Sequence, residues 1–138
     1  MRNWLHCVWG TKSRASFLNE ENKSKILEHI RTNAKSKNIY IYSINGCRDH
    51  VRCLISLLPD QNIAKIMQMI KGESSFWINK TGLCSNFEWA DEYFAVSISE
   101  SQIERVKNYI KNQEIHHKRK SWEEEYREFI KNYNFEKN

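Results

Sequence analysis

Residues 45–59 read "NGCRDHVRCLISLLP", and this stretch decides the fold. Apolar side chains recur at every second position, which predicts a β-strand with one buried face: Val51, Cys53, Ile55 and Leu57. The intervening positions, which begin with His50 and Arg52, point to the opposite face. A turn over 46–49 connects this strand to residues 38–45, whose alternating pattern predicts the preceding strand.

The rest of the chain predicts strands and helices in alternation. Strands are expected over 3–11 and 87–99, the second one interrupted near 90–92. Four helices are expected at 20–37 behind an Asn19 cap, from Pro59–Asp60 to an end within 71–82, at 100–117 and at 121–133.

The resulting order is β-α-β-β-α-β followed by two helices. This order predicts an α+β fold of the ferredoxin-like, split βαβ type, with an antiparallel sheet and helices on one of its faces. The other face is then free to hold a site that includes His50 and Arg52. One domain over 1–138 is expected, with 121–138 as a C-terminal helical tail, because the chain has no repeat and few breaks.

Composition narrows the class of protein. Lysine and arginine number 22 against 17 acidic residues, a net charge of +5 that suits nucleic acid without requiring it. No apolar run is long enough for a membrane helix and no signal peptide is apparent, so a cytoplasmic protein without a membrane partner is expected.

The four cysteines form no C-x-x-C pair and are expected to be reduced. A zinc site from Cys47, His50 and Cys53 is disfavoured, because Cys53 should point away from His50.

Several ordered motifs resemble one known family. They are "LHCVWGTKSR" (5–14), "NGCRDHVRCLISL" (45–57), "MIKGESSFWIN" (69–79), "FEWADEYFAVSISES" (87–101) and "VKNYIKNQEIHHKRKSWEEEYREFI" (106–130). Together they cover almost the whole chain. They are similar to the single-tyrosine transposases of the insertion-sequence 200/605 type, including the repetitive-palindrome-associated relatives, within the HUH endonuclease superfamily.

The resemblance implies cleavage and rejoining of single-stranded DNA beside a hairpin. A tyrosine hydroxyl attacks a phosphodiester, which leaves a 5′-phosphotyrosine and a free 3′-hydroxyl. Two histidines and a helix residue hold Mg²⁺ or Mn²⁺, which polarises the phosphate. The covalent bond conserves the phosphodiester energy, so no nucleotide cofactor is expected. Members of the family work as dimers, and a homodimer is therefore expected here.

By resemblance, Tyr109 is the nucleophile, and His50 and Gln113 are metal ligands. Gln113 follows Tyr109 by one helical turn, so the two residues face the same way. Arg52 stands where the family has its second histidine. A guanidinium has no lone pair and stays charged, so it cannot coordinate an ion. The sequence therefore predicts a weakened metal site with reduced or lost cleavage; alternatively, Arg52 grips the phosphate itself.

Basic residues are expected to contact the DNA backbone. The candidates are Lys12, Arg14, Lys71, His116, Lys118, Arg119 and Lys120. Three aromatic residues could stack on unpaired bases, although core packing is the preferred interpretation for the tryptophans: Trp77, Trp89 and Tyr93.

Two other functions compete with strand transfer. The first is a non-catalytic, domesticated protein that binds hairpin or single-stranded DNA. The second is a ferredoxin-like RNA-binding domain. The second is disfavoured because residues 50–57 lack the glycine-rich aromatic strand motif of such domains.

Overall fold

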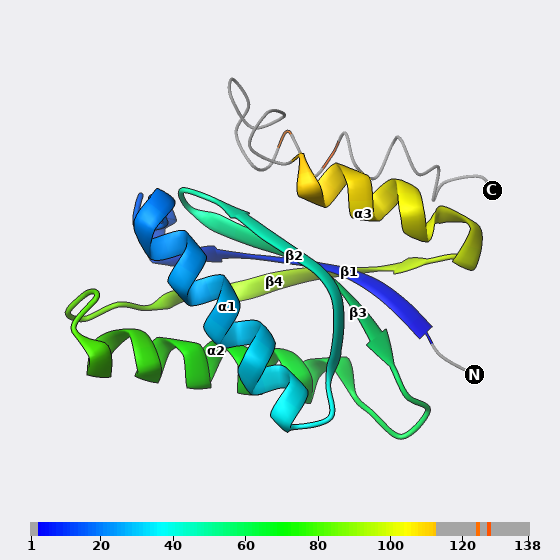
Figure 1. The fold of residues 1–138 in the computed structure, drawn as a ribbon, viewed down its shortest axis with the longest axis horizontal. Helices are drawn as coiled ribbons and strands as arrows, with labels where there is room; N and C mark the ends of the chain where they lie inside the picture. Colours follow the sequence, from blue (N-terminus) through cyan, green and yellow to red (C-terminus); the bar gives the residue numbers. More distant parts are fainter. Residues whose placement is uncertain (1–2, 113–123, 125–126, 128–138) are drawn as a thin grey trace.

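The computed structural model describes residues 3–112, 124 and 127. Within these residues, the fold is built on one antiparallel sheet of four strands. In the sheet the strands lie in the order β2-β3-β1-β4 (Figure 1). Their bounds are Asn3–Thr11 for β1, Tyr40–Cys47 for β2, His50–Leu57 for β3 and Trp89–Ile98 for β4. This strand order confirms the ferredoxin-like arrangement, because β1 and β3, distant in sequence, pair at the centre.

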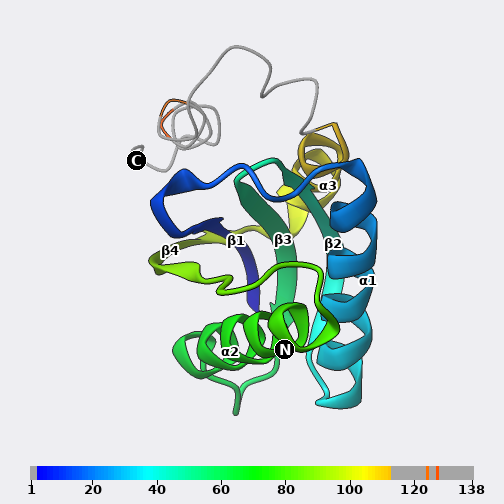
Figure 2. The same cartoon turned by 90° about the vertical axis from the view of Figure 1, so that its left-hand side faces the viewer.

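The sheet has helices on both faces (Figures 1 and 2). Helices α1 (Glu20–Ser36) and α2 (Ile63–Thr81) pack on one face, as expected. Helix α3 (Ile103–Lys111) follows the short 3-10 turn η2 (Glu100–Gln102) and packs on the opposite face. The face expected to be free is therefore covered by α3.

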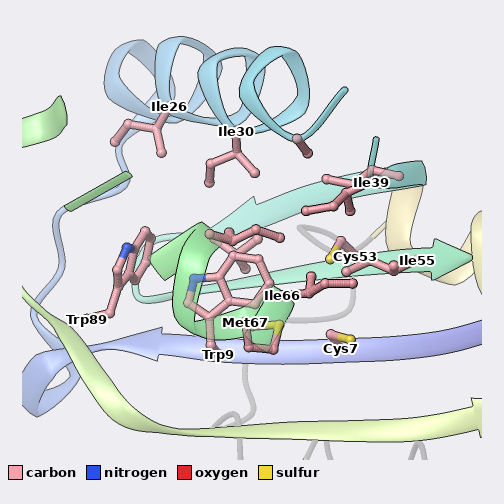
Figure 3. Packing of buried hydrophobic residues seen from close by; sticks show 14 of the residues in the cluster. Cys7, Trp9, Ile26, Ile30, Ile39, Cys53, Ile55, Ile66, Met67 and Trp89 are labelled. Atoms are coloured by element: carbon pink, nitrogen blue, oxygen red, sulfur yellow. The ribbon is translucent and has the colours of Figure 1, made fainter. Parts of the chain in front are cut away.

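The main core fills the space between the sheet and helices α1 and α2 (Figure 3). Trp9 is fully buried at its centre, and Ile26 and Ile30 of α1 and Met67 of α2 pack around it. The alternate positions of β1 and β3 supply the sheet side of this core. The alternation that predicted β3 therefore holds.

A smaller core fixes α3 to the sheet. Ile103, Val106 and Ile110 are buried against Leu54 of β3 and Ile98 of β4. The spacing of the three helix residues gives one apolar stripe, which the sequence predicted to face inward. Because Tyr109 immediately precedes Ile110, this packing fixes where the tyrosine lies.

Helix ends follow from side chains that cap the backbone. The Asn19 side chain accepts a hydrogen bond from the backbone of Asn22, as predicted for the start of α1. The expected start of α2 at Pro59–Asp60 is wrong. The helix begins at Ile63, since the Asn62 side chain accepts from the backbone of Lys65. It ends where Gly82 adopts a left-handed conformation.

Two strand boundaries also differ from expectation. Strand β2 runs over Tyr40–Cys47 rather than 38–45, and the preceding Asn38 has a positive φ of 64° that an extended strand does not allow. The interruption expected near 90–92 is a bulge inside β4. Trp9 pairs with Tyr93 but Thr11 with Trp89, so the two strands differ in length there.

The helix expected over 100–117 is shorter than predicted: it begins at Ile103 after η2 and ends at Lys111, with Asn112 in a turn. Residues 113–117 and most of the tail 121–138 lie outside the described residues. Within the described part of the chain, no helix has both the length and the apolar character needed to cross a membrane.

Candidate active site

Three basic side chains share the face of the sheet that α3 covers. His50 and Arg52 come from alternate positions of β3, and His6 comes from β1. Arg52 pairs with Val8, and His6 occupies the next position of β1 on the same face, so the two side chains are diagonal neighbours. All three are fully buried, which is rare for basic groups and marks a specialised site.

Tyr109 reaches this cluster from α3. Its ring centroid lies 5.2 Å from the Arg52 Cζ atom, in a cation–π arrangement. It also lies 6.4 Å from the His6 ring, edge to face. The residue expected to act as nucleophile therefore lies on the same face as His50 and Arg52.

His6 is a site residue that sequence reasoning missed. Burial, reinforced by the positive charge of Arg52, lowers its pKa well below the ordinary value. It is therefore neutral at neutral pH, and the unprotonated nitrogen of its ring can accept a hydrogen bond. The sequence shows only that His6 lies in the first strand. Its closeness to Arg52 follows from the β1–β3 register, which the sequence pattern does not reveal.

His50 is held by an acidic neighbour. Its Nδ1 lies 2.8 Å from Oδ1 of Asp49, and Oδ2 of the same carboxylate accepts from Arg14 at 2.8 Å. Burial alone would raise the pKa of Asp49, but the hydrogen bond with His50 and the charges of His50 and Arg14 hold it below its ordinary value. Asp49 is therefore a carboxylate shared by two basic groups.

Two of the residues predicted to contact the DNA backbone, Lys12 and Lys71, lie near the start of β4. Lys12 pairs with Glu88 at 3.0 Å on the surface, and the Lys71 ammonium donates to the Asp91 carbonyl at 2.9 Å. Arg14 is tied to Asp49 instead. The remaining expected contacts (His116, Lys118, Arg119 and Lys120) lie outside the described residues.

Surface pockets adjoin these lysines, and two of them lie beside β4. One, of about 400 Å³, lies between the loop at Lys12 and the start of β4, and Gly10 forms part of its wall. The other, of about 380 Å³, lies between α2 and β4 and is lined by Lys71 and Tyr93. Since Gly10 pairs with His50, the first pocket borders the buried cluster.

The tryptophans serve packing, in line with the preferred interpretation. Trp89 is buried against Trp9, and its indole donates to the Ser74 hydroxyl at 2.9 Å. Trp77 stacks on His29 of α1, with ring centroids 4.1 Å apart. Tyr93 is only partly buried beside Lys71.

The residues present do not fit the divalent ion that the resemblance implies. His50 suits a ligand, but Arg52 offers no lone pair. A guanidinium about 4 Å from a divalent ion would cost about 8 kcal/mol at an effective dielectric near 20. Gln113 lies outside the described residues. Within the described ranges, no three His, Cys, Asp or Glu side chains are placed to share an ion. The disfavoured zinc site fails as well, because Cys53 packs in the α1–α2 core.

Comparison with known proteins establishes the family. The sequence model of the "Transposase IS200 like" family matches residues 2–113. The chain belongs to the IS200-like transposases. It is 25% identical over 114 residues to the ISDra2 transposase TnpA of Deinococcus radiodurans, which covers 78% of this chain and 81% of the relative. This match confirms the resemblance inferred from the motifs. Members of the family cut DNA and move mobile elements.

Solved structures show that this IS200-like transposase shares a known fold. A crystal structure of a transposase candidate from Deinococcus radiodurans superposes with a TM-score of 0.67 at 21% identity, over 82% of this chain and 92% of the other. A REP-associated tyrosine transposase bound to a REP hairpin superposes with a TM-score of 0.65 at 15% identity, over 84% and 68%.

Proposed function

We propose that this IS200-like transposase binds single-stranded or hairpin DNA and transfers one strand through Tyr109. The phenol oxygen attacks a phosphodiester and loses its proton, a new Oη–P bond forms, and the bond from phosphorus to the 3′ oxygen breaks. The products are a 5′-phosphotyrosine and a free 3′-hydroxyl. The observation that carries the proposal is the position of Tyr109, 5.2 Å from a buried guanidinium on the face that also holds His50.

The neighbouring side chains have complementary roles in this proposal. Arg52 presents a fixed positive charge beside the phenol, which stabilises the negative charge that builds up on the phosphate oxygens. His6 is neutral and edge-on to Tyr109, so it helps to hold the phenol ring in place. A DNA partner is supported by family membership and by the REP hairpin bound in the similar structure.

We also propose that Arg52 weakens or abolishes the site for Mg²⁺ or Mn²⁺, so that cleavage is reduced. The same residue supports the second candidate function, a domesticated protein that binds hairpin or single-stranded DNA without cutting it. The two functions share the DNA ligand and differ only in the chemical step. A homodimer, which the resemblance implies, remains part of the proposal, and light scattering on the full chain tests it.

Titration of Mn²⁺ into the wild type and into Arg52→His by calorimetry tests the role of Arg52. We expect the substitution to create or strengthen ion binding and to increase nicking of a single-stranded hairpin substrate at least tenfold. Nicking confined to Arg52→His would favour the non-catalytic binder as the natural function. Equal ion binding by both proteins would refute the proposed effect of Arg52.

A further inference from the structure

The turn between β2 and β3 holds a carboxylate that joins two basic groups. We propose that Asp49 and Arg14 are positioning residues, which fix His50 as the tautomer with its proton on Nδ1 and its lone pair on Nε2. The name "positioning relay" is used below for Arg14, Asp49 and His50. The positioning relay rests on the proposed function only in that His50 is taken as a residue of the active site. The geometry of the relay is independent of the DNA chemistry.

Each oxygen of the Asp49 carboxylate has its own basic partner. Oδ1 lies 2.8 Å from Nδ1 of His50, and Oδ2 accepts from both Nε and an Nη of Arg14 at 3.0 and 2.8 Å. The Asp49 side chain is 16% exposed and that of Arg14 is 33% exposed, so water screens these contacts only in part. An ionised carboxylate only accepts hydrogen bonds, so the proton in the bond to His50 must sit on Nδ1.

The backbone that carries Asp49 is locked separately. The Thr11 backbone N–H donates to the Asp49 carbonyl at 2.9 Å, and the Leu18 N–H donates to the Arg48 carbonyl at 2.8 Å. Gly10 allows the close approach of β1, because a Cβ atom at that position would lie 3.1 Å from the Asp49 carbonyl oxygen. None of these contacts uses the Asp49 side chain, so its removal should leave the turn in place.

Arg14 reaches Asp49 through an unusual loop. Ser13 and Arg14 both have φ values of 57°, in the left-handed region that residues other than glycine seldom adopt. The Thr11 hydroxyl donates to the Ala15 carbonyl at 2.7 Å and closes this loop. Two successive strained residues are kept where the surrounding structure requires them, often at functional sites. Here the conformation brings a guanidinium from the loop against the carboxylate.

The consequence for the site is a fixed acceptor on the α3 face. With Nδ1 protonated, the His50 lone pair lies on Nε2, the nitrogen that can take a proton or a cation. Arg14 was predicted from the sequence to contact DNA phosphates. Its contacts in the structure point to the additional role of orienting the Asp49 carboxylate.

Long-range ¹H–¹⁵N NMR of the uniformly labelled full chain tests the positioning relay without DNA or metal. At mildly alkaline pH, where histidines are neutral, we expect the wild-type His50 spectrum to show the Nδ1–H form. Asp49→Ala and Arg14→Ala should shift His50 toward the Nε2–H form, which is preferred by free histidine. Asp49→Asn should rescue the wild-type pattern, because its amide oxygen still accepts a hydrogen bond from Nδ1.

Lys12→Ala is the matched control. Lys12 lies in the same loop as Arg14 but pairs with Glu88, so its removal should leave the His50 tautomer unchanged. The His29 signals and the circular dichroism spectrum report whether each variant is folded. An Nε2–H form in the wild type, or a wild-type tautomer in folded Asp49→Ala, would overturn the relay. Neither result depends on whether Tyr109 forms an adduct, so a failure of the proposed function is recognised separately.

Discussion

The proposed weakening of the cation site rests on a single buried guanidinium. Arg52 lies on the same face as His50, 5.2 Å from the Tyr109 ring centroid, and is closed off from solvent. A positive charge in that place attracts a phosphate and repels a divalent ion. We therefore expect DNA binding to persist in a protein whose cation site is weakened. In this proposal Arg52 impairs binding of the divalent ion and supports binding of DNA.

His6 should make the protein sensitive to acid. Because the pKa of buried His6 is well below its ordinary value of 6.5, the unfolded chain binds a proton that the folded chain excludes. This contribution to stability is complete above about pH 6.5 and is lost as the pH falls further, by at most about 1.4 kcal/mol per pH unit. Urea unfolding of His6→Gln between about pH 7.5 and 5.5 should show a shallower pH dependence than the wild type.

His29→Gln serves as the control for that measurement. His29 is partly buried and pairs with Glu73 at 2.9 Å between α1 and α2, away from the buried cluster. This variant should keep the decline in stability that His6 causes. A His6→Gln protein as acid-sensitive as the wild type would show that His6 is not the buried neutral histidine described above.

The sequence predicted the position of a site residue correctly where the periodicity of a single strand or helix determines that position. The placing of His50 and Arg52 on one face needed only the alternation of β3. His6 and Asp49 were missed because their roles depend on pairing and on loop conformation. His6 becomes a neighbour of Arg52 only in the β1–β3 register, and Asp49 meets Arg14 only through a left-handed loop. Neither feature leaves a periodic signal in the sequence.

At the scale of elements, two glycines, one inside α2 and one directly after it, should have opposite effects when replaced by alanine. Gly72 lies inside the helix, and an added Cβ would meet nothing within 4 Å. Gly72→Ala should therefore stabilise the protein by about 0.5–1 kcal/mol. Gly82 ends the helix with a φ of 84°, which alanine adopts only with strain. Gly82→Ala should destabilise the protein by about 1 kcal/mol.

Thermal unfolding of the two variants beside the wild type measures these opposite shifts. The pair is self-controlled, because the chemical change is the same and only the backbone conformation differs. A destabilised Gly72→Ala would mean that the middle of α2 is not regular helix. An unchanged Gly82→Ala would contradict the left-handed helix end.

Elements were predicted more accurately than their ends. The apolar stripe over 63–70 predicted α2, yet its start moved to Ile63 because the capping side chain is Asn62 rather than a group at Pro59–Asp60. The irregularity near 90–92 was correctly located in the sequence, but only the pairing with β1 shows that it is a bulge within one continuous strand. Caps and bulges depend on individual hydrogen bonds, which periodicity does not encode.

At the scale of the whole molecule, the order of elements predicted the topology, while the position of α3 required the structure. A β-α-β-β-α-β order has few compact solutions, and the β2-β3-β1-β4 sheet is one of them. The stripe of α3 predicted an inward face without stating which side of the sheet it covers. Its packing against Leu54 and Ile98 brings Tyr109 to the cluster of His6 and Arg52.

Covalent capture of DNA is the most direct test of this account. A single-stranded hairpin substrate with a flanking strand is incubated with the wild type, Tyr109→Phe, Arg52→His and the double variant, each with Mn²⁺. Mass spectrometry of digested adducts then locates the 5′-phosphate. We predict an adduct on Tyr109 that is most abundant in Arg52→His and absent from both phenylalanine variants. An adduct that survives Tyr109→Phe, or no adduct in any of the four proteins, would contradict the assignment of Tyr109 as the nucleophile.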